Sequence, residues 1–475
     1  MKIKLYNTMG RQLEEFQSIV PSHVGMYGCG PTVYNYAHIG NLRTFIFEDV
    51  LKRMLIHFGY EVKHVMNITD VGHLTGDGDD GEDKLGKMAR ETGRSAWDIA
   101  KFYTEAFFKD YDSLNIVRPN IICEATKHIP EMIALICRLE DGGHTYVSGG
   151  NVYFSIDTFP EYGKLANLDL SRLQSGARTD VDSNKRNPLD FVLWFTRSKF
   201  GKQEMMWDSP WGEGYPGWHI ECSAMSMKYL GEQFDIHCGG IDAIPVHHTN
   251  EIAQSEAATG KIPWVRYWLH AEFLLSGSTG GKMSKSSGEF LTLPLLVSKG
   301  YDPLDYRLFC LGAHYRSQLQ FSYQAMDSAK ASRKVLMEKV GQLRLACSGK
   351  ELPQINGSET GWIHEFDESI AADMNMPKAM AALWGLLKDD SMSAEEKLAG
   401  VLYMDQVLGL KLDTAVCEAD SDLDVPQEVL DLVEKRAMAK KSKDWVAADK
   451  ARDMIEQMGF AVKDTPQGAK LVKKV

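Results

Sequence analysis

The sequence lacks the features of several common protein classes. Its 475 residues contain no run of about 18 apolar residues, so a membrane span is not expected. The first ten residues, MKIKLYNTMG, lack the apolar segment of a signal peptide, which predicts a cytoplasmic protein. The eight cysteines form no CxxC pair, and in a reducing compartment most of them should be free, buried thiols.

The chain also lacks an excess of positive charge. Its formal net charge of -12 excludes a wholly basic nucleic-acid binder, so any RNA contact must come from a local basic patch. One candidate is the segment 435–475, which contains eleven Lys/Arg and five Asp/Glu and so has a local net charge of +6. Charged faces are usually just solvated, so this segment alone is a weak indication. The acidic run 76–83, GDGDDGED, lacks the ligand spacing of a calcium loop and is interpreted as a solvated turn.

The N-terminal part has the pattern of a strand, a helix and a second strand. A short apolar run at 24–27 ends in a glycine-rich turn, and apolar residues then recur at helical spacing from Leu42 to Phe58. The segment 61–69, EVKHVMNIT, has the pattern of a buried strand. This order predicts a right-handed parallel unit, in which ligands bind beyond the carboxyl ends of the strands.

A second unit of the same kind follows later in the chain. The segment 232–242, EQFDIHCGGID, predicts a strand with a glycine turn, and 247–260, HHTNEIAQSEAATG, predicts a helix that ends at Gly260. The Gly/Ser-rich segment 276–290 is expected to be a mobile loop, and the pattern is mostly helical from Tyr323 onward. The predicted fold class is α/β, with a Rossmann-like parallel-sheet catalytic domain that contains an insertion, then a helical bundle and a small C-terminal domain.

These patterns predict six regions. The first and second halves of the catalytic domain are expected at 1–128 and 212–275, separated by a connective insertion at 129–211. The remainder is divided into a stem-contact region with the glycine-rich loop at 276–322, a helical bundle at 323–412 and a small basic region at 413–475.

Two short motifs predict binding of a nucleoside triphosphate. The turn GCGPTV does not fit a dinucleotide site, because the third glycine of GxGxxG is absent. In HIGN, His38 stands at a helix N-terminus that favours phosphate, Gly40 permits close approach of a nucleotide, and Asn41 can donate a hydrogen bond. In KMSKS, Lys282 and Lys285 lie on a loop that could fold over a triphosphate and stabilise a departing pyrophosphate. Either motif alone is weak evidence, whereas both in this order are specific.

With these motifs the chain resembles the class I aminoacyl-tRNA synthetases, and within them the cysteinyl-tRNA synthetase family. The resemblance covers nearly the whole sequence. The segments that carry it are YGCGPTVYNYAHIGN, NITDV, GARTDVDSNKRNPLDFVLW, SPWGEGYPGWHIECSAM, DIHCGG, HHTNEIAQSEA, KMSKS, AHYR and DTPQG.

The resemblance implies one zinc ion per chain in the amino-acid pocket, with Cys29, Cys222, His247 and Glu251 as ligands. The residue chemistry is compatible, since His247 and Glu251 stand four residues apart on one helix face and two thiolates, an imidazole and a carboxylate suit zinc. Cys238 is a competing ligand that we expect only to line the pocket. Zinc would serve as a selector, because it bonds the sulfur of cysteine in a way that a serine hydroxyl cannot match.

Other roles also follow from the resemblance. Thr69, Trp218 and His237 are expected to line the cysteine pocket, and Gly240 and Asp242 to bind the adenosine. Taken alone, GGID could be a simple turn, and the aspartate of NITDV could cap the next element. Two segments depart from the family pattern: NITDVGHLTGDGDDGEDK is longer than the usual NITDVDDK, and IPVHHTNE stands where HHENE is common.

The activity that the resemblance implies is ligation of cysteine to tRNA in two steps. Cysteine carboxylate would attack the α-phosphate of ATP, with Mg²⁺ on the phosphates, and the cysteinyl group would pass to the terminal ribose of tRNA(Cys). His38, Asn41 and Lys285 are the expected catalytic residues, acting by positioning and charge stabilisation. The expected partners are ATP, L-cysteine and tRNA(Cys) without a membrane, and the chain is expected to act as a monomer. The resemblance implies that 276–322 contacts the tRNA stem and that 413–475 binds the anticodon.

Two alternatives to this activity are a ligase with a different acceptor and a protein without catalytic activity. A ligase that joins cysteine to an amino-sugar would share the zinc ligands, HIGN and KMSKS, but would not need a basic C-terminal segment for RNA. A catalytically inactive RNA-binding protein would not need intact His38, Lys285 and zinc ligands. The basic C-terminal segment therefore favours tRNA as the acceptor.

Overall fold

The computed structural model describes residues 1–72, 84–168, 183–197, 204–276, 281–282, 290–355, 357, 361–416, 426–442, 444–465 and 468–473. They belong to two compact units, Met1–Ala415 and Val416–Val475.

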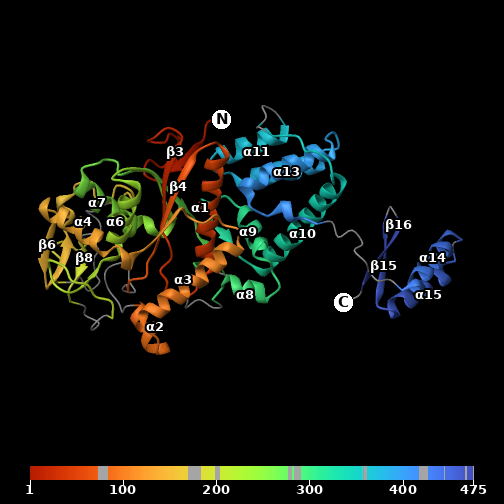
Figure 1. Ribbon diagram of the computed structural model, residues 1–475, viewed down its shortest axis with the longest axis horizontal. Coiled ribbons are helices and arrows are strands. Elements are labelled where there is room, and N and C mark those ends of the chain that lie inside the picture. The colour runs from red at the N-terminus through yellow and green to blue at the C-terminus, as the bar shows by residue number, and fades with distance from the viewer. Residues whose placement is uncertain are drawn as a thin grey trace. The chain divides into compact units, whose positions relative to one another are not determined.

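A five-stranded parallel sheet forms the centre of the first unit (Figure 1). Its order is β11-β10-β3-β4-β5, with bounds Val265–Ala271, Phe234–Gly240, His23–Gly28, Glu61–Ile68 and Ile121–Glu124. The chain runs from β3 to β4 on one side, whereas β10 pairs with the other side of β3. The strand order therefore reverses between β3 and β10, which is where parallel sheets bind ligands.

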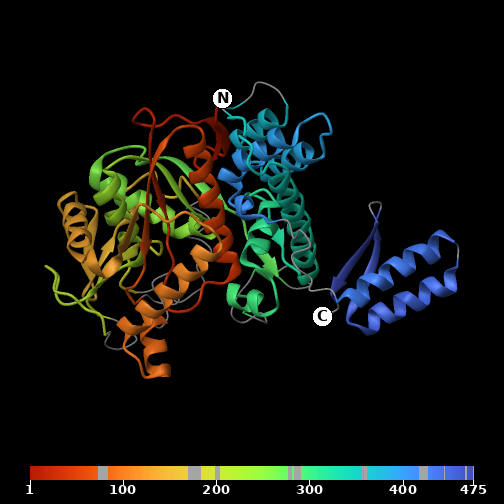
Figure 2. The same cartoon turned by 45° about the vertical axis from the view of Figure 1, so that its right-hand side comes forward.

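Helices cover both faces of this sheet. Helix α1 (Ile39–His57) packs on one face and contacts α9 (Pro303–Leu311) and α13 (Ala394–Leu408) on its outer side. Helices α4 (Ile129–Asp141), α6 (Trp218–Leu230) and α7 (Thr249–Thr259) contact one another on the other face. Figures 1 and 2 show α1 on one side of β3 and β4, with α6 and α7 on the opposite side.

The predicted βαβ elements are present, with small shifts at their ends. Helix α1 begins at Ile39 with His38 as its N-cap, as HIGN predicts, and His38 and Asn41 form a capping box that satisfies the first free amides. In the second predicted βαβ segment, a π-turn at Ile244–His248 precedes α7. Gly260 ends α7 as predicted, in the left-handed conformation at φ +67.

The predicted insertion contains three strands of a four-stranded antiparallel sheet. The order of this sheet is β6-β7-β8-β9, with bounds Thr145–Ser148, Asn151–Phe154, Phe191–Phe195 and Tyr215–Pro216. The last strand lies beyond the predicted insertion range of 129–211, and α4 from the start of that range packs on the main sheet through α6 and α7.

Smaller elements connect these layers. Strands β1 (Lys4–Asn7) and β2 (Gln12–Glu15) form a hairpin, and helices α2 (Lys84–Thr92) and α3 (Ala96–Ser113) follow β4. Strands β12 (Leu274–Ser276), β13 (Gly281–Lys282) and β14 (Leu319–Gln320) form a small sheet, and α8 (Leu293–Ser298) precedes α9. The acidic run 76–83 and most of the predicted mobile loop lie outside the described residues.

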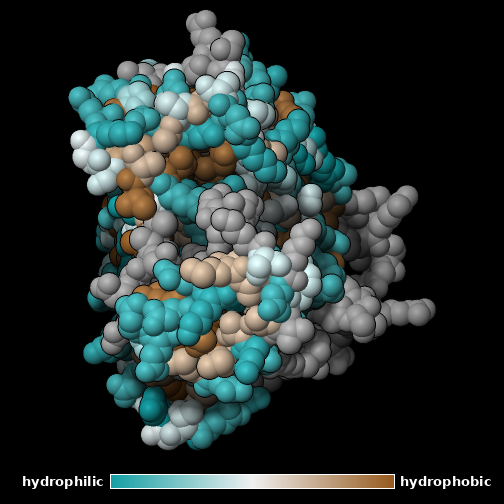
Figure 3. Space-filling view, turned by 90° about the vertical axis from the view of Figure 1, so that its right-hand side faces the viewer, coloured by the Kyte–Doolittle hydropathy of each residue, from teal (hydrophilic) through white to brown (hydrophobic). Residues whose placement is uncertain are grey.

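The predicted helical bundle begins at Tyr323. It consists of α10 (Tyr323–Ala346), α11 (Gly361–Ala371), α12 (Met376–Lys388) and α13. The second unit contains α14 (Gln427–Lys441), α15 (Trp445–Gln457) and a hairpin of β15 (Phe460–Thr465) and β16 (Gly468–Lys473). Hydrophilic residues predominate on the face of the molecule in Figure 3, as the 25% charged residues would predict.

The predicted fold class is confirmed: a parallel-sheet α/β domain with an insertion precedes a helical bundle and a small C-terminal domain. Within the described residues, no helix is both long and apolar enough to cross a membrane.

Candidate active site

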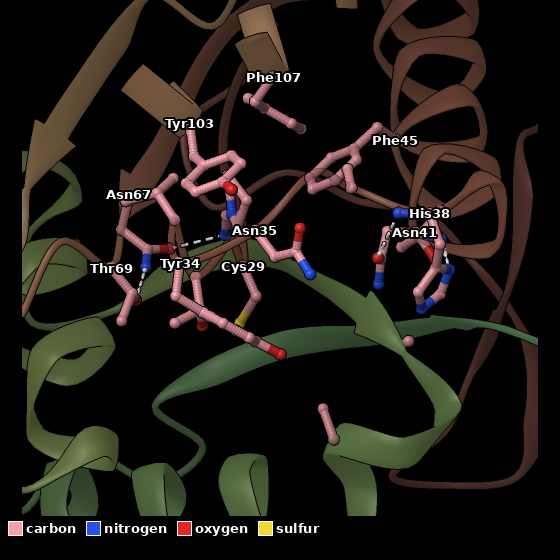
Figure 4. Close-up of a pocket in the computed structure, with 18 of the residues that line it drawn as sticks. Cys29, Tyr34, Asn35, His38, Asn41, Phe45, Asn67, Thr69, Tyr103 and Phe107 are labelled. Carbon is pink, nitrogen blue, oxygen red and sulfur yellow. Dashed lines mark hydrogen bonds between the residues drawn. The ribbon is translucent and has the colours of Figure 1, made fainter. Parts of the chain in front are cut away.

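A cleft of about 450 Å³ opens at the carboxyl ends of β3 and β10. Its walls include Cys29 after β3, Asp242 after β10, and His38 and Asn41 at the start of α1. In Figure 4 the Cys29 sulfur points into this cleft, with His38 and Asn41 farther along it. The cleft therefore lies at the reversal of strand order, as the sequence predicts.

The turn after β3 needs a glycine to present Cys29. A Cβ on Gly30 would lie 1.6 Å from the Asn67 carbonyl oxygen, so no larger residue fits there. The Gly30 amide donates to Asn67 Oδ1 at 2.8 Å, which ties the turn to the end of β4. The thiol of Cys29 is thus held at the floor of the cleft by its backbone.

Four side chains from separate elements come together around Cys29. Cys222 comes from α6, His247 from the π-turn and Glu251 from α7, and the ligand atoms of all four lie within 4.8 Å of one another. His247 Nε2 and Glu251 Oε1 are 2.9 Å apart, as the four-residue spacing predicts. The structure therefore brings together all four of the proposed zinc ligands.

The ionisation of this cluster suits a cation. A hydrogen bond from Cys29 lowers the pKa of Cys222 to about 7, and the same bond together with burial raises the pKa of Cys29. Burial opposes the charged forms of His247 and Glu251. The Glu251 carboxylate and Cys222 nevertheless raise the pKa of His247 to about 10, and the imidazoles of His237 and His247 lower the pKa of Glu251 to about 2.

One buried atom of this cluster supports a metal directly. Although Glu251 Oε1 faces His247 Nε2, it has no hydrogen-bond partner of acceptable geometry within the described residues. Buried carboxylate oxygens are costly to leave unpaired. Two thiols, an imidazole and this oxygen, with donor atoms within 4.8 Å of one another, form a donor set that zinc fits.

A layer of histidines lies behind the four proposed ligands. His237 Nε2 is 2.9 Å from Glu251 Oε2, and His248 Nε2 is 3.3 Å from the Cys29 sulfur. His248 continues to His270 at 2.8 Å, which in turn is 2.8 Å from the Thr8 hydroxyl. Cys29, His237, His248 and Glu251 form a second set of four possible ligands, which shares Cys29 and Glu251 with the first set. The histidine layer also orients the first set through its contacts with these two residues.

The expectation that Cys238 lines the pocket is wrong. Alternate residues of a strand point to opposite faces, and His237 takes the face of the histidine layer. The Cys238 side chain is wholly buried in the core beneath α1, while its carbonyl accepts a hydrogen bond from the Cys29 amide at 3.2 Å. Its thiol therefore belongs to the core and not to the cleft.

The residues expected around the substrate cysteine lie at two depths. Thr69 and Trp218 line the cleft, and the Trp218 ring lies 4.5 Å from the His247 ring. The Thr69 hydroxyl donates to Glu221 at 3.1 Å and accepts from Asn67 at 3.0 Å, which fixes its orientation. His237 is wholly buried behind them and reaches the cluster through Glu251.

His38 and Asn41 have a structural role as well as a possible catalytic one. Asn41 N donates to His38 Nδ1 at 3.1 Å, and His38 N donates to Asn41 Oδ1 at 3.3 Å. Because Nδ1 accepts, the ring proton of neutral His38 is placed on Nε2, the form that donates to a phosphate oxygen. Gly40 follows at the first turn, where a Cβ would lie 2.9 Å from the His38 ring.

The structure describes three of the four other residues that are expected to bind the nucleotide. Gly240 and Asp242 line the cleft at the end of β10, across from α1. Lys282, the first residue of KMSKS, belongs to β13 and pairs with Leu275 of β12. Lys285 lies outside the described residues.

A buried acid lies directly beneath β3, the strand that ends one residue before Cys29. Glu48 of α1 is 0% exposed, and neither carboxylate oxygen has a hydrogen-bond partner within the described residues. A Cβ on Gly28 would lie 2.6 Å from Glu48 Oε2 and 3.2 Å from His64 Nε2, so the missing side chain of Gly28 makes the space for both. Burial raises the pKa of Glu48 to about 8 and lowers the pKa of His64 to about 3.

Glu48→Gln is therefore expected to stabilise the fold most at high pH. Because the folded pKa of about 8 exceeds the usual 4.5, folding takes up a proton and this group's contribution to stability falls as pH rises from 4.5 to 8. The stability gained by the variant should be about 2 kcal/mol larger at pH 7.5 than at pH 5.5, measured by denaturant unfolding. Glu105→Gln, at an exposed position of α3, is the control. An equal effect of Glu48→Gln on stability at both pH values would contradict the raised pKa of Glu48.

Comparison with known proteins agrees with this geometry. Residues 15–331 match the family model described as tRNA synthetases class I (C) catalytic domain. The cysteine–tRNA ligase of Treponema denticola is 52% identical over 98% of this chain and 98% of that protein. The chain belongs to the cysteine–tRNA ligase family. Cysteine–tRNA ligase 1 of Burkholderia lata is 47% identical over 99% of this chain and 97% of its own length.

A solved structure supports the fold of this cysteine–tRNA ligase family member. Methionyl-tRNA synthetase of Mycobacterium tuberculosis, bound by methionyl-adenylate, superposes with a TM-score of 0.54 at 15% identity. The match covers 86% of this chain and 94% of that protein. At this identity the likeness concerns the fold alone, and it agrees with the central parallel sheet.

Sequence reasoning missed the supporting histidines of the cysteine–tRNA ligase site. His219, His248 and His270 all contact the proposed ligands or one another, with His219 Nδ1 3.0 Å from His247 Nδ1. The doublet at 247–248 was visible, but helical spacing alone would place the second histidine on another face. The π-turn changes that geometry and puts both rings beside the cluster.

Proposed function

We propose that this chain ligates L-cysteine to tRNA(Cys) in the cytoplasm, as a monomer, by way of cysteinyl-adenylate. The observation that carries the proposal is the shared cleft: Cys29, Cys222 and His247 of the four-residue cluster line the same space as His38 and Asn41 of the HIGN helix start. A metal that selects an amino acid and a helix N-terminus that binds a nucleotide are what such a reaction needs side by side.

Cys29, Cys222, His247 and Glu251 would hold one zinc ion. Zinc bound there would take up the sulfur of the substrate, which distinguishes cysteine from serine by a bond that an alcohol cannot match. The histidine layer would keep the ligands oriented, since His237 and His248 contact Glu251 and Cys29 from behind. Thr69 and Trp218 would shape the pocket around the amino acid.

The nucleotide side of the cleft would bind ATP with its Mg²⁺. Asp242 would accept hydrogen bonds from the ribose hydroxyls, and Gly240 would allow the adenosine to approach the end of β10. His38 and Asn41 would donate to the phosphates at the N-terminus of α1. The cysteine carboxylate would then attack the α-phosphate and pyrophosphate would leave, with positioning and charge stabilisation in place of a general base.

Lys285→Ala is expected to slow adenylate formation more than it weakens ATP binding. Its charge, with that of Lys282, would matter most when pyrophosphate departs, and one such contact is worth about 3 kcal/mol, or roughly 10² in rate. Cysteine-dependent ATP–pyrophosphate exchange measures the rate, and the KM for ATP measures binding. An unchanged exchange rate would remove Lys285 from the mechanism.

Zinc affinity should rise with pH. In the metal-free cluster His247 carries a proton, since its pKa is about 10, and Cys29 keeps its thiol proton because its pKa is raised. Zinc must displace these protons, so binding releases them and strengthens from pH 6 to pH 9. Competition with a chelator of known affinity measures this slope. A zinc affinity independent of pH would contradict the proposed ligand set.

A second candidate function differs only in the acceptor. A ligase for an amino-sugar would need the same zinc cluster and nucleotide site, whereas the basic segment 435–475, with its net charge of +6, favours an RNA acceptor. The distinguishing experiment incubates the zinc-loaded protein with radiolabelled cysteine, ATP and either tRNA or an amino-sugar. We expect acid-precipitable, base-labile label on tRNA(Cys) only. Label on the sugar and none on tRNA would favour the second function.

A further inference from the structure

An exposed group of aromatic rings borders the cleft on the side of α3. Tyr36 and Phe102 are 40% and 41% exposed, and Tyr103 is half-buried between them. The three rings meet edge to face, with centroids 5.2 Å apart for Tyr36–Tyr103, 5.1 Å for Phe102–Tyr103 and 6.1 Å for Tyr36–Phe102. We call Tyr36, Phe102 and Tyr103 the aromatic wall.

The aromatic wall is continuous with the active-site cleft. Tyr36 and Tyr103 line the same cavity as Cys29, His38 and Asp242. Figure 4 shows Tyr103, Phe107 and Phe45 together along one side of this cavity, above the Cys29 sulfur. Phe107 is buried, so the rings grade from the core outward to the exposed rim at Phe102.

The helices beside the aromatic wall carry a small excess of positive charge. Residues 84–105, which include α2 and the first half of α3, contain five Lys/Arg against three Asp/Glu in a chain whose net charge is -12. The guanidinium carbon of Arg94 lies 5.6 Å from the centroid of the Phe102 ring. Exposed ring faces beside cations are typical of surfaces that stack unpaired bases and hold their phosphates.

We propose that the aromatic wall receives the unpaired nucleotides at the 3′ end of the tRNA. The proposal rests on the proposed function, because the terminal ribose must enter the cleft to accept the cysteinyl group. A base-paired stem is too wide for a cleft of about 450 Å³, so only single-stranded nucleotides can bring the ribose there. Bases stack on Tyr36 and Phe102, and Arg94 contacts the adjoining phosphate.

The test compares ring removal with ring retention. Tyr36→Ala and Phe102→Ala should each raise the KM for tRNA in aminoacylation by about tenfold, because one stacked base is worth that order of affinity. Tyr36→Phe and Phe102→Tyr keep the rings and should stay within about twofold of the unchanged protein. Trp97→Ala removes a ring of 47% exposure from the same helix, one that packs against Trp207 instead of the wall, and should also stay within about twofold.

A truncated tRNA separates stacking from a structural effect. Binding of tRNA that lacks its last three nucleotides should be equal for the unchanged protein and the two alanine variants, whereas full-length tRNA should distinguish them. Cysteine-dependent ATP–pyrophosphate exchange by the unchanged protein and its charging of tRNA test the proposed function independently. Equal weakening of both tRNAs, a raised KM for ATP in place of tRNA, or an equal effect of Trp97→Ala would each overturn the proposal.

Discussion

Cys222→Ser is expected to lose zinc and, with it, activation of cysteine. A serine hydroxyl does not ionise near neutral pH, so the cluster would keep one thiolate, and the buried Glu251 carboxylate would lose the cation that it faces. Zinc content should fall well below one ion per chain. Cysteine-dependent ATP–pyrophosphate exchange should fall by roughly 10³, which corresponds to about 4 kcal/mol of transition-state stabilisation.

The matched control is Cys238→Ala. Cys238 is as deeply buried as Cys222, and its backbone contacts Cys29, yet its side chain packs in the core beneath α1. This variant should keep one zinc ion and near-normal exchange even if its melting temperature falls. Elemental analysis of both purified variants, alongside Glu251→Ala, decides the ligand set. Full zinc occupancy in Cys222→Ser and Glu251→Ala would contradict the proposed ligand set.

Deletion of the segment from Lys435 is expected to impair tRNA charging and not cysteine activation. This segment has a net charge of +6 and lies within the second compact unit, outside the unit that contains the cleft. Up to six neutralised phosphates predict a loss of roughly 10³ in kcat/KM for tRNA at low salt, and a flatter dependence on salt. Exchange with cysteine should stay near the intact level.

Stability must be controlled in this experiment, because the deletion cuts α14 at Lys435 and removes α15 and the hairpin, which share a hydrophobic core with α14. A second variant, in which Lys435, Lys440 and Lys450 are changed to glutamine, keeps those elements and should shift the salt dependence in the same direction. Thermal melting of both proteins establishes that the first unit remains folded. Normal charging by the folded truncation would show that the C-terminal unit does not bind the tRNA.

The order of elements could be predicted from the sequence because both βαβ units have clear periodicity. The apolar spacing from Leu42 to Phe58 predicts α1, and Gly260 predicts the end of α7. HIGN also predicts the start of α1 at His38, whereas the part that Asn41 takes in the capping box is not predicted, because Asn41 is expected only to contact a phosphate. Here the same residues serve the helix and the proposed chemistry.

The residues that lie behind the proposed ligands could not be predicted in the same way. Which residues stand behind a ligand depends on how separate elements pack, as with His270 of β11 and His248 of the π-turn. Cys238 shows the same limit, because the face of the sheet that its side chain occupies follows only from the register of β10 with β3. Glu48 beneath Gly28 was also missed, since burial of a lone acid has no local signal.

ATP–pyrophosphate exchange with cysteine and with serine tests the central claim most directly. In the zinc-loaded protein, kcat/KM for cysteine should exceed that for serine by roughly 10⁴ or more, because a pocket that relied on shape alone would reach only about 10². Removal of zinc with a chelator should abolish exchange with cysteine, and added zinc should restore it. Exchange with serine within about 10² of that with cysteine, or exchange with cysteine that survives complete loss of zinc, would contradict the account.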